Sequence, residues 1–129
     1  LVDPSDAATR QMLDEYTHRW EMADISGLVS LLKQDASFVM PPSPSWYRGW
    51  ASITQFLATI IPPVKWRLRP AHANHQPAFG LYQFDPEAGV YRAFAIQVLA
   101  IEGGQIREVV TFLHPALFAA FGLPDEVRD

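Results

Sequence analysis

The segment VYRAFAIQVLAIEGGQIREVVTFLH, residues 90–114, decides the fold. It holds two runs rich in β-branched and aromatic residues, which favour β-strands. Gly103 and Gly104 separate the two runs. Because adjacent glycines accept the positive φ angles of a tight primed turn, the pair indicates a hairpin. The sequence therefore predicts antiparallel strands over residues 90–101 and 105–114.

The hairpin strands are apolar on both faces. A strand in a sheet that helices cover on one side normally alternates between apolar and polar residues. Here one face of the first strand carries Ala93, Ala95 and Leu99, and the other face carries large apolar side chains as well. A face of this kind is rarely left exposed in a monomer. We therefore expect something other than the chain's own helices to cover the second face.

The segments around the hairpin add two strands and a helix. Residues 66–74 and 77–84 read as strands, and a turn at residues 85–89 joins them to the hairpin. After the hairpin, residues 115–121 predict a short helix. Gly122 follows that helix in the position that favours a left-handed cap.

The first half of the chain has helical periodicity. Tyr16 and Trp20 lie on the apolar face of a first helix. Asp24 is placed to cap a second, short helix, whose buried stripe is Leu28, Leu31 and Leu32. Residues 36–40 predict a brief strand, and Gly49 opens a third helix. Helices first and a strand meander afterwards predict an α+β fold, with the helices packed on one face of a curved, mostly antiparallel sheet.

Length and composition set outer limits on the function. The chain has 129 residues, which predicts a single domain over residues 1–129. Its net charge of −4 argues against a non-specific grip on nucleic acid or on an anionic membrane. It has no cysteine, and His72 and His75 fall on opposite faces of a strand, so we expect no metal site and no cofactor. No apolar run is long enough to span a membrane, so we expect a cytoplasmic protein. The first residue is Leu1 rather than Met, which is compatible with a piece of a longer chain.

The order of elements resembles the cone-shaped nuclear transport factor 2-like fold, also called SnoaL-like. Three stretches are more narrowly similar to the C-terminal SnoaL-like domain of certain extracytoplasmic-function sigma factors: MPPSPSWYRG at residues 40–49, NHQPAF at 74–79, and PALF with FGLP within 115–124. This resemblance implies a regulatory domain that docks on the sigma domains of a longer chain. It also implies that the domain itself makes no direct contact with nucleic acid.

The resemblance extends to ketosteroid isomerases, which share the fold and use a tyrosine, a carboxylate base and a second acid. Tyr16 matches the tyrosine, Met40 falls at the base and Gln97 at the second acid. Because neither Met40 nor Gln97 can transfer a proton as those acids do, the resemblance implies a non-catalytic domain with no catalytic residues. The Gln97 match also places its face of the hairpin inside the cone. We therefore predict that the outer face is an interface with a second copy or with the sigma domains. Its residues are Phe94, Ile96, Val98, Val110 and Phe112.

Inside the cone, large rings and a few neutral polar groups suit a small apolar ligand. We predict a pocket formed by Tyr16, Trp20, Met40, Trp46, Tyr47, Phe56, Trp66 and Gln97. The same side chains equally suit a filled core. A second functional reading is a small isomerase, cyclase or dehydratase that uses Tyr16 with His72 or His114 as the polar partner. A third is a plain homodimeric binding protein.

Overall fold

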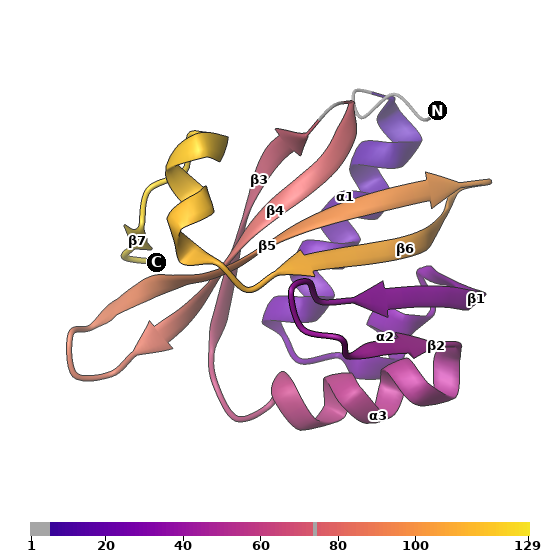
Figure 1. The fold of residues 1–129 in the computed structure, drawn as a ribbon, viewed down its shortest axis with the longest axis horizontal. Helices are drawn as coiled ribbons and strands as arrows, with labels where there is room; N and C mark the ends of the chain where they lie inside the picture. The colour runs from indigo at the N-terminus through magenta and orange to yellow at the C-terminus, as the bar shows by residue number, and fades with distance from the viewer. Residues whose placement is uncertain (1–5, 74) are drawn as a thin grey trace.

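A strongly curved sheet organises the protein, as seen in a computed structural model that describes residues 6–73 and 75–129, with only the backbone of His72 (Figure 1). The elements follow the order α1 (Ala7–Glu21), α2 (Ile25–Val29), β1 (Leu32–Val39), β2 (Trp46–Arg48), α3 (Trp50–Ile60), β3 (Trp66–Ala73), β4 (Gln76–Asp85), β5 (Val90–Glu102), β6 (Gln105–Phe112), the 3₁₀ helix η1 (Pro115–Phe121) and β7 (Glu126–Val127). The predicted α+β class with a mostly antiparallel sheet is confirmed.

The strands lie in the order β2-β1-β6-β5-β4-β3, and β7 pairs with β5. All neighbours are antiparallel except β1 and β6, which run parallel. The predicted hairpin is β5–β6. Gly103 and Gly104 at its turn have φ angles of 60° and 79°, as a primed turn requires.

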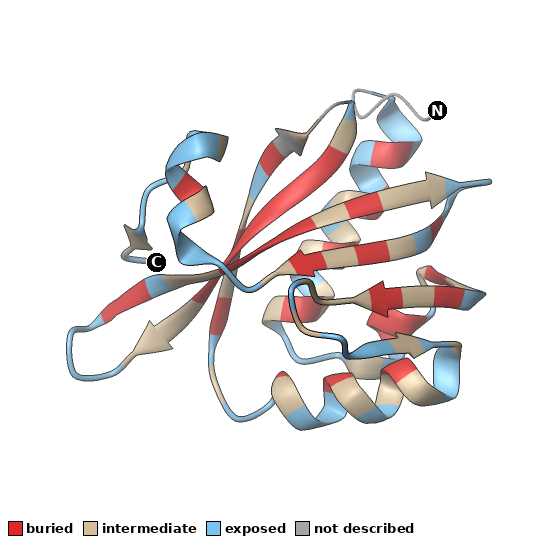
Figure 2. Ribbon diagram, in the orientation of Figure 1, coloured by how far each residue is buried: buried red, intermediate tan, exposed pale blue. Residues whose placement is uncertain are grey.

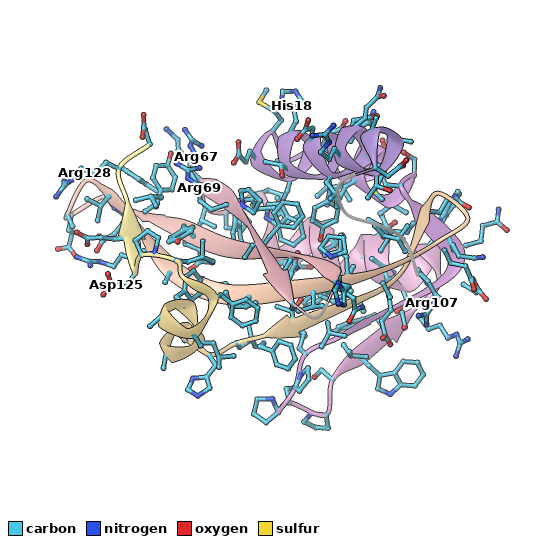
Figure 3. The ribbon with its side chains drawn as sticks, turned by 90° about the horizontal axis from the view of Figure 1, so that it is seen from above. His18, Arg67, Arg69, Arg107, Asp125 and Arg128 are labelled. Atoms are coloured by element: carbon cyan, nitrogen blue, oxygen red, sulfur yellow. The ribbon has the colours of Figure 1, made fainter. Side chains whose placement is uncertain are left out.

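The helices lie on both faces of the sheet. Viewed from above, α1 covers one face and η1 lies on the opposite one (Figure 3). The larger buried cluster lies between α1, α3 and the inner face, and includes Trp20, Leu57 and Leu99. Buried residues lie along the middle of the long strands and also at the start of β3 and β5, whereas the turns after β4 and β5 are exposed (Figure 2). The cone shape therefore comes from one sheet that bends around the helices of the first half.

A second, smaller cluster covers part of the outer face. It joins Tyr82, Ile96 and Phe118, with the Tyr82 and Phe118 rings 5.1 Å apart. Gly80 permits this approach, because an added Cβ would lie 2.7 Å from Leu123 Cδ1 and 2.9 Å from Phe118 Cε2. The expectation that something other than the chain's own helices covers this face is thus wrong for the part around Ile96, where the chain's own η1 lies.

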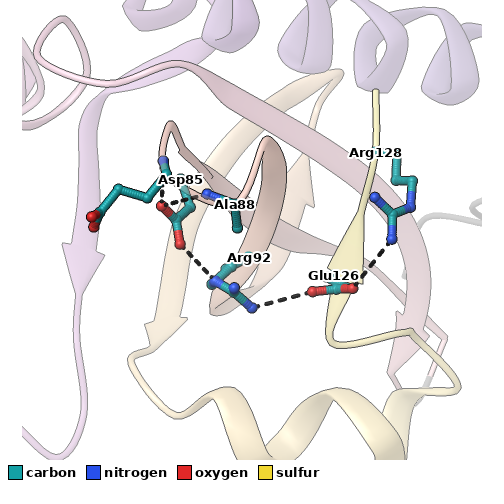
Figure 4. A network of polar contacts seen from close by, with 6 residues as sticks. Asp85, Ala88, Arg92, Glu126 and Arg128 are labelled. Carbon is teal, nitrogen blue, oxygen red and sulfur yellow. Dashed lines mark hydrogen bonds and ion pairs between the residues drawn. The ribbon is translucent and has the colours of Figure 1, made fainter.

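An ion-pair network holds the C-terminal segment against the β4–β5 turn (Figure 4). Arg92 Nε lies 2.8 Å from Asp85 Oδ2, and its Nη1 lies 3.2 Å from Glu126 Oε2. Arg128 reaches the other oxygen of Glu126 at 4.0 Å. The hydrogen bond from Arg92 lowers the pKa of the Asp85 carboxyl. These contacts fix β7 beside β5 and so support the position of η1.

Side chains occupy the free edge of β3. The Leu68 N–H donates to Glu21 Oε2 at 2.9 Å, and Arg67 Nη1 donates to the Trp66 carbonyl at 2.9 Å. Arg69 Nη1 donates to the Leu68 carbonyl at 3.4 Å. Pro70, next along this strand, has no N–H to offer.

The helix starts follow the capping residues, whereas the start of the first strand was misplaced. Asp6 and Asp24 cap α1 and α2, accepting from Thr9 N and Gly27 N at 3.1 Å each. Asn74, at the end of the strand expected over residues 66–74, lies outside the described residues. The strand expected at residues 36–40 begins earlier, at Leu32, which the helical pattern had assigned to the second helix. The short strands β2 and β7 were not predicted, because three and two residues give no readable alternation.

Candidate functional site

An apolar cavity of about 440 Å³ lies between α3 and the inner face of the sheet. Its exposed lining residues, Thr59, Pro63 and Leu113, mark the mouth. The lining consists of Trp20, Phe38, Met40, Phe56, Thr59, Ile60, Pro63, Trp66, Leu81, Gln83, Phe94, Gln97, Thr111 and Leu113. Most of these side chains are apolar, and none of them is an acid, a histidine, a lysine or an arginine.

A β-bulge in β5 builds one wall of this cavity. Leu81 pairs with Ala95 and the next residue, Tyr82, pairs with Ala93, so Phe94 is an extra residue in β5. The bulge turns the Phe94 ring inwards, where it meets the Trp66 ring edge to face at 5.6 Å. It turns Ala93 towards the outer cluster instead. The predicted sides of Phe94 and Ala93 were therefore wrong, because strict alternation does not hold across a bulge.

Aromatic side chains support a second wall from behind. The Tyr47 ring stacks on Phe56 with centroids 4.3 Å apart, and Phe38 tilts against the same ring at 5.6 Å. Tyr47 thus stands behind the cavity rather than lining it. Trp46 alternates to the other side of β2 and is 60% exposed. Trp46 was predicted to line the pocket, but it lies outside the cavity lining.

Three buried polar side chains form the floor. Tyr16 Oη donates to Gln97 Oε1 at 2.6 Å, and Gln97 Nε2 donates to Thr111 Oγ1 at 3.1 Å. Burial raises the pKa of the Tyr16 phenol well above its usual value. Because the folded-state pKa is raised, the stability that Tyr16 contributes is complete below the ordinary tyrosine pKa and is lost as the pH rises above it.

The structure brings together most of the predicted pocket residues. Trp20, Met40, Phe56, Trp66 and Gln97 all line the cavity, and Tyr16 lies beneath it through its bond to Gln97. A signal in the sequence for the missed residue Thr111 was its place opposite Gln97 across the hairpin, a pairing that the structure shows. For Phe94 the strand pattern carried no such signal.

The predicted polar partner His114 does not join Tyr16. His114 is exposed and caps η1, away from the cavity lining. The backbone of His72 pairs with Pro77, and its side chain lies outside what the structure describes. Among the described residues, no group of three His, Asp or Glu side chains could hold a metal ion. Across the same residues, no helix is long and apolar enough to cross a membrane.

The predicted interface divides into three parts. Phe94 points into the cavity, and Ile96, which is 0% exposed, is covered by the cluster around Phe118. Val98, Val110 and Phe112 remain partly exposed on the outer face. They share a shallow groove of about 360 Å³ with Ala73, Gln76, Ala100, Glu108 and Phe121.

The curved sheet, with its helices and its central cavity, has the architecture of a cone-shaped nuclear transport factor 2-like domain. The chain belongs to the SnoaL-like domain family, which matches residues 13–109. Two solved structures show the same fold: a nuclear transport factor 2-like protein of unknown function from Cytophaga hutchinsonii (TM-score 0.63, 14% identity, 83% of this chain and 90% of that one) and a de novo designed protein with a curved β-sheet (TM-score 0.69, 12% identity, 92% and 94%).

A curated relative is more similar in sequence. The chain is 34% identical, over 98% of its length, to the ECF RNA polymerase sigma factor SigG of Mycobacterium tuberculosis. It spans 35% of that protein, so about two-thirds of the relative has no counterpart here. The chain is therefore a SnoaL-like domain of the kind associated with a sigma factor.

Proposed function

We propose that this chain is a non-catalytic regulatory domain of an extracytoplasmic-function sigma factor, which binds a small apolar ligand and modulates transcription initiation. One observation carries the proposal: in a chain 34% identical to SigG over nearly its whole length, the central cavity is lined by no ionisable side chain. A cavity of this composition suits binding and lacks the groups for proton transfer. The role places the domain in the cytoplasm, with RNA polymerase.

The alternative of a Tyr16-dependent enzyme has less support. The Tyr16 hydroxyl already donates to Gln97, and its raised pKa keeps the proton on it. His114 lies outside the cavity lining.

The genomic context tests the regulatory role. We expect the reading frame upstream of residue 1 to encode the helical domains of a sigma factor. In transcription with purified RNA polymerase, removing this domain from the longer chain should change the amount of transcript from a promoter that the sigma factor recognises. A start codon directly before residue 1, or unchanged transcription, would contradict the proposal.

Filling the cavity should abolish ligand binding. N-phenyl-1-naphthylamine, an uncharged apolar dye, should bind saturably and gain fluorescence. Met40→Trp puts a larger ring into the lining and should weaken binding at least about tenfold, because the space for the dye is lost. The matched control is Met22→Trp, since Met22 is exposed and lies outside the lining. Equal binding by wild type and Met40→Trp, both folded by circular dichroism, would count against ligand binding in the cavity.

We propose further that the outer groove joins two copies of the isolated domain. Of its lining residues only Glu108 is ionisable, and it accepts a hydrogen bond from Ser37 at 3.1 Å. A weakly charged sheet face can meet its own copy about a two-fold axis, sheet against sheet. The apolar character of Val98, Val110 and Phe112 supplies the driving force. In a longer chain, the sigma domains could occupy the same face.

Sedimentation velocity at micromolar concentration tests this contact. Wild type should sediment as a dimer. The double variant Val110→Glu with Phe112→Glu should sediment as a monomer, because the two carboxylates added to each copy would be buried against the other copy. The control is Met22→Glu with Trp46→Glu, which changes two exposed apolar residues outside the groove. A wild-type monomer, or a dimer that persists in the groove variant, would refute the contact.

A further inference from the structure

The hydrogen bonds at the cavity floor run from Tyr16 through Gln97 to Thr111. Tyr16 is 1% exposed and packs between the rings of Phe79 and Trp20, at 5.5 and 5.9 Å. Turning the Gln97 amide over would move the unused hydroxyl hydrogen from Thr111 to Tyr16, which does not line the cavity. With the Gln97 oxygen facing Tyr16, the Tyr16 hydroxyl hydrogen is bonded, and the amide N–H₂ faces Thr111.

This direction leaves a hydrogen unused on Thr111. Its Oγ1 accepts from Gln97 Nε2, so the hydroxyl still has its own hydrogen to donate. Among the described residues, no acceptor receives it. Thr111 is 3% exposed and lines the cavity. A buried donor without an acceptor is unfavourable, and a ligand that offers an acceptor atom removes that penalty.

Trp20 adds a second hydrogen-bond donor at the cavity. Trp20 also lines the cavity, and its indole Nε1–H has no hydrogen-bond partner in the described part of the chain. This nitrogen is covered by neighbouring atoms, which leaves the Thr111 hydroxyl as the donor that a ligand meets. No positive side chain lines the cavity, so a carboxylate would be desolvated there without a counter-charge.

We propose that the cavity takes an uncharged, largely apolar molecule that carries a carbonyl-type oxygen, and that the Thr111 hydroxyl donates to this oxygen. The proposal rests on the ligand-binding role proposed above and adds the chemical class of the ligand. Tyr16 takes no part in recognition except by holding Gln97, and through Gln97 by orienting Thr111. Ketones and esters meet the requirement, because their oxygen accepts and they bring no donor that the floor must satisfy.

Two probes of matched shape test it. Fluorenone and fluorene differ by the ketone oxygen, and their affinities are measured by quenching of tryptophan fluorescence. Wild type should bind fluorenone about fivefold to tenfold more tightly than fluorene, the effect of one added hydrogen bond. Thr111→Val keeps the shape and removes the hydroxyl, so the ratio should fall to about one while fluorene affinity is kept. Thr111→Ser restores a hydroxyl and should restore the ratio.

The outcomes separate this inference from the function on which it rests. If wild type binds both probes equally, or if Thr111→Val keeps the preference for fluorenone, the assignment to Thr111 is wrong although the cavity binds ligands. If neither probe binds, the ligand-binding role fails and the assignment fails with it. Thr59→Val is the matched control at the mouth, because its hydroxyl donates to the Gln55 carbonyl within α3. It should leave the ratio unchanged.

Discussion

Ile96→Glu is expected to destabilise the domain severely. Ile96 is 0% exposed and packs in the outer cluster with Tyr82 and Phe118. A carboxylate there would be buried among aromatic rings without a partner, a change that costs more than about 4 kcal/mol. Small domains have a free energy of unfolding of only about 5–15 kcal/mol, so a loss of this size removes most of the stability of a domain at the lower end of that range. Urea denaturation followed by circular dichroism measures the effect.

The same substitution at Val110 is the matched control. Val110 lies on the same outer face, but η1 does not cover it, and its side chain is partly exposed. At sub-micromolar concentration, where self-association contributes nothing, Val110→Glu should lose no more than about 1 kcal/mol. A folded Ile96→Glu with a wild-type denaturation midpoint would contradict the position of η1 on this face.

The second large effect is a missing activity. The domain should not isomerise a 3-oxo-Δ5 steroid above the buffer rate, although its fold is shared with isomerases. General acid and base groups each contribute roughly 10²–10⁴-fold to such a reaction. The cavity lining contains no acid and no histidine, and Met40 and Gln97 are the residues that the resemblance places at the base and the second acid. The rate should therefore lie several orders of magnitude below that of an enzyme with both groups.

The conjugated enone product absorbs in the ultraviolet, so a spectrophotometric assay over hours gives an upper limit for the isomerisation rate. Tyr16→Phe is the decisive variant, because it removes the one floor hydroxyl that the isomerase resemblance implicates. Wild type and Tyr16→Phe should both match the buffer. Turnover well above buffer that Tyr16→Phe abolishes would show that the domain is an enzyme.

Much of the architecture could be predicted from local signals. The Gly103-Gly104 turn, the Asp24 cap and the glycine before α3 each dictate a backbone geometry, and each is found where the sequence places it. The start of β1 was misplaced because Leu32 fits a helical stripe and a strand equally well. Its assignment is settled by pairing with Ile106 of β6, a contact far along the chain.

The site was predictable in composition but not in detail. The large aromatic side chains and the neutral amide predicted a pocket that includes Trp20, Trp66 and Gln97, and these three residues line the cavity. The inward turn of Phe94 depends on one extra residue in β5, which arises from the match between two strands and leaves no mark in either. The cover over Ile96 could not be foreseen either, because a short 3₁₀ helix does not announce the face on which it docks.

The occupied edge of β3 limits the ways in which copies of this domain can meet. Growth of an intermolecular sheet needs a strand that offers free N–H and C=O groups in register. On β3 the Leu68 N–H is held by Glu21, the Trp66 carbonyl is held by Arg67, and Pro70 has no donor at all. The opposite edge, β2, is only three residues long. Along these two edges the described strands therefore offer few free backbone groups in register for an added strand, although many of the strand residues are apolar.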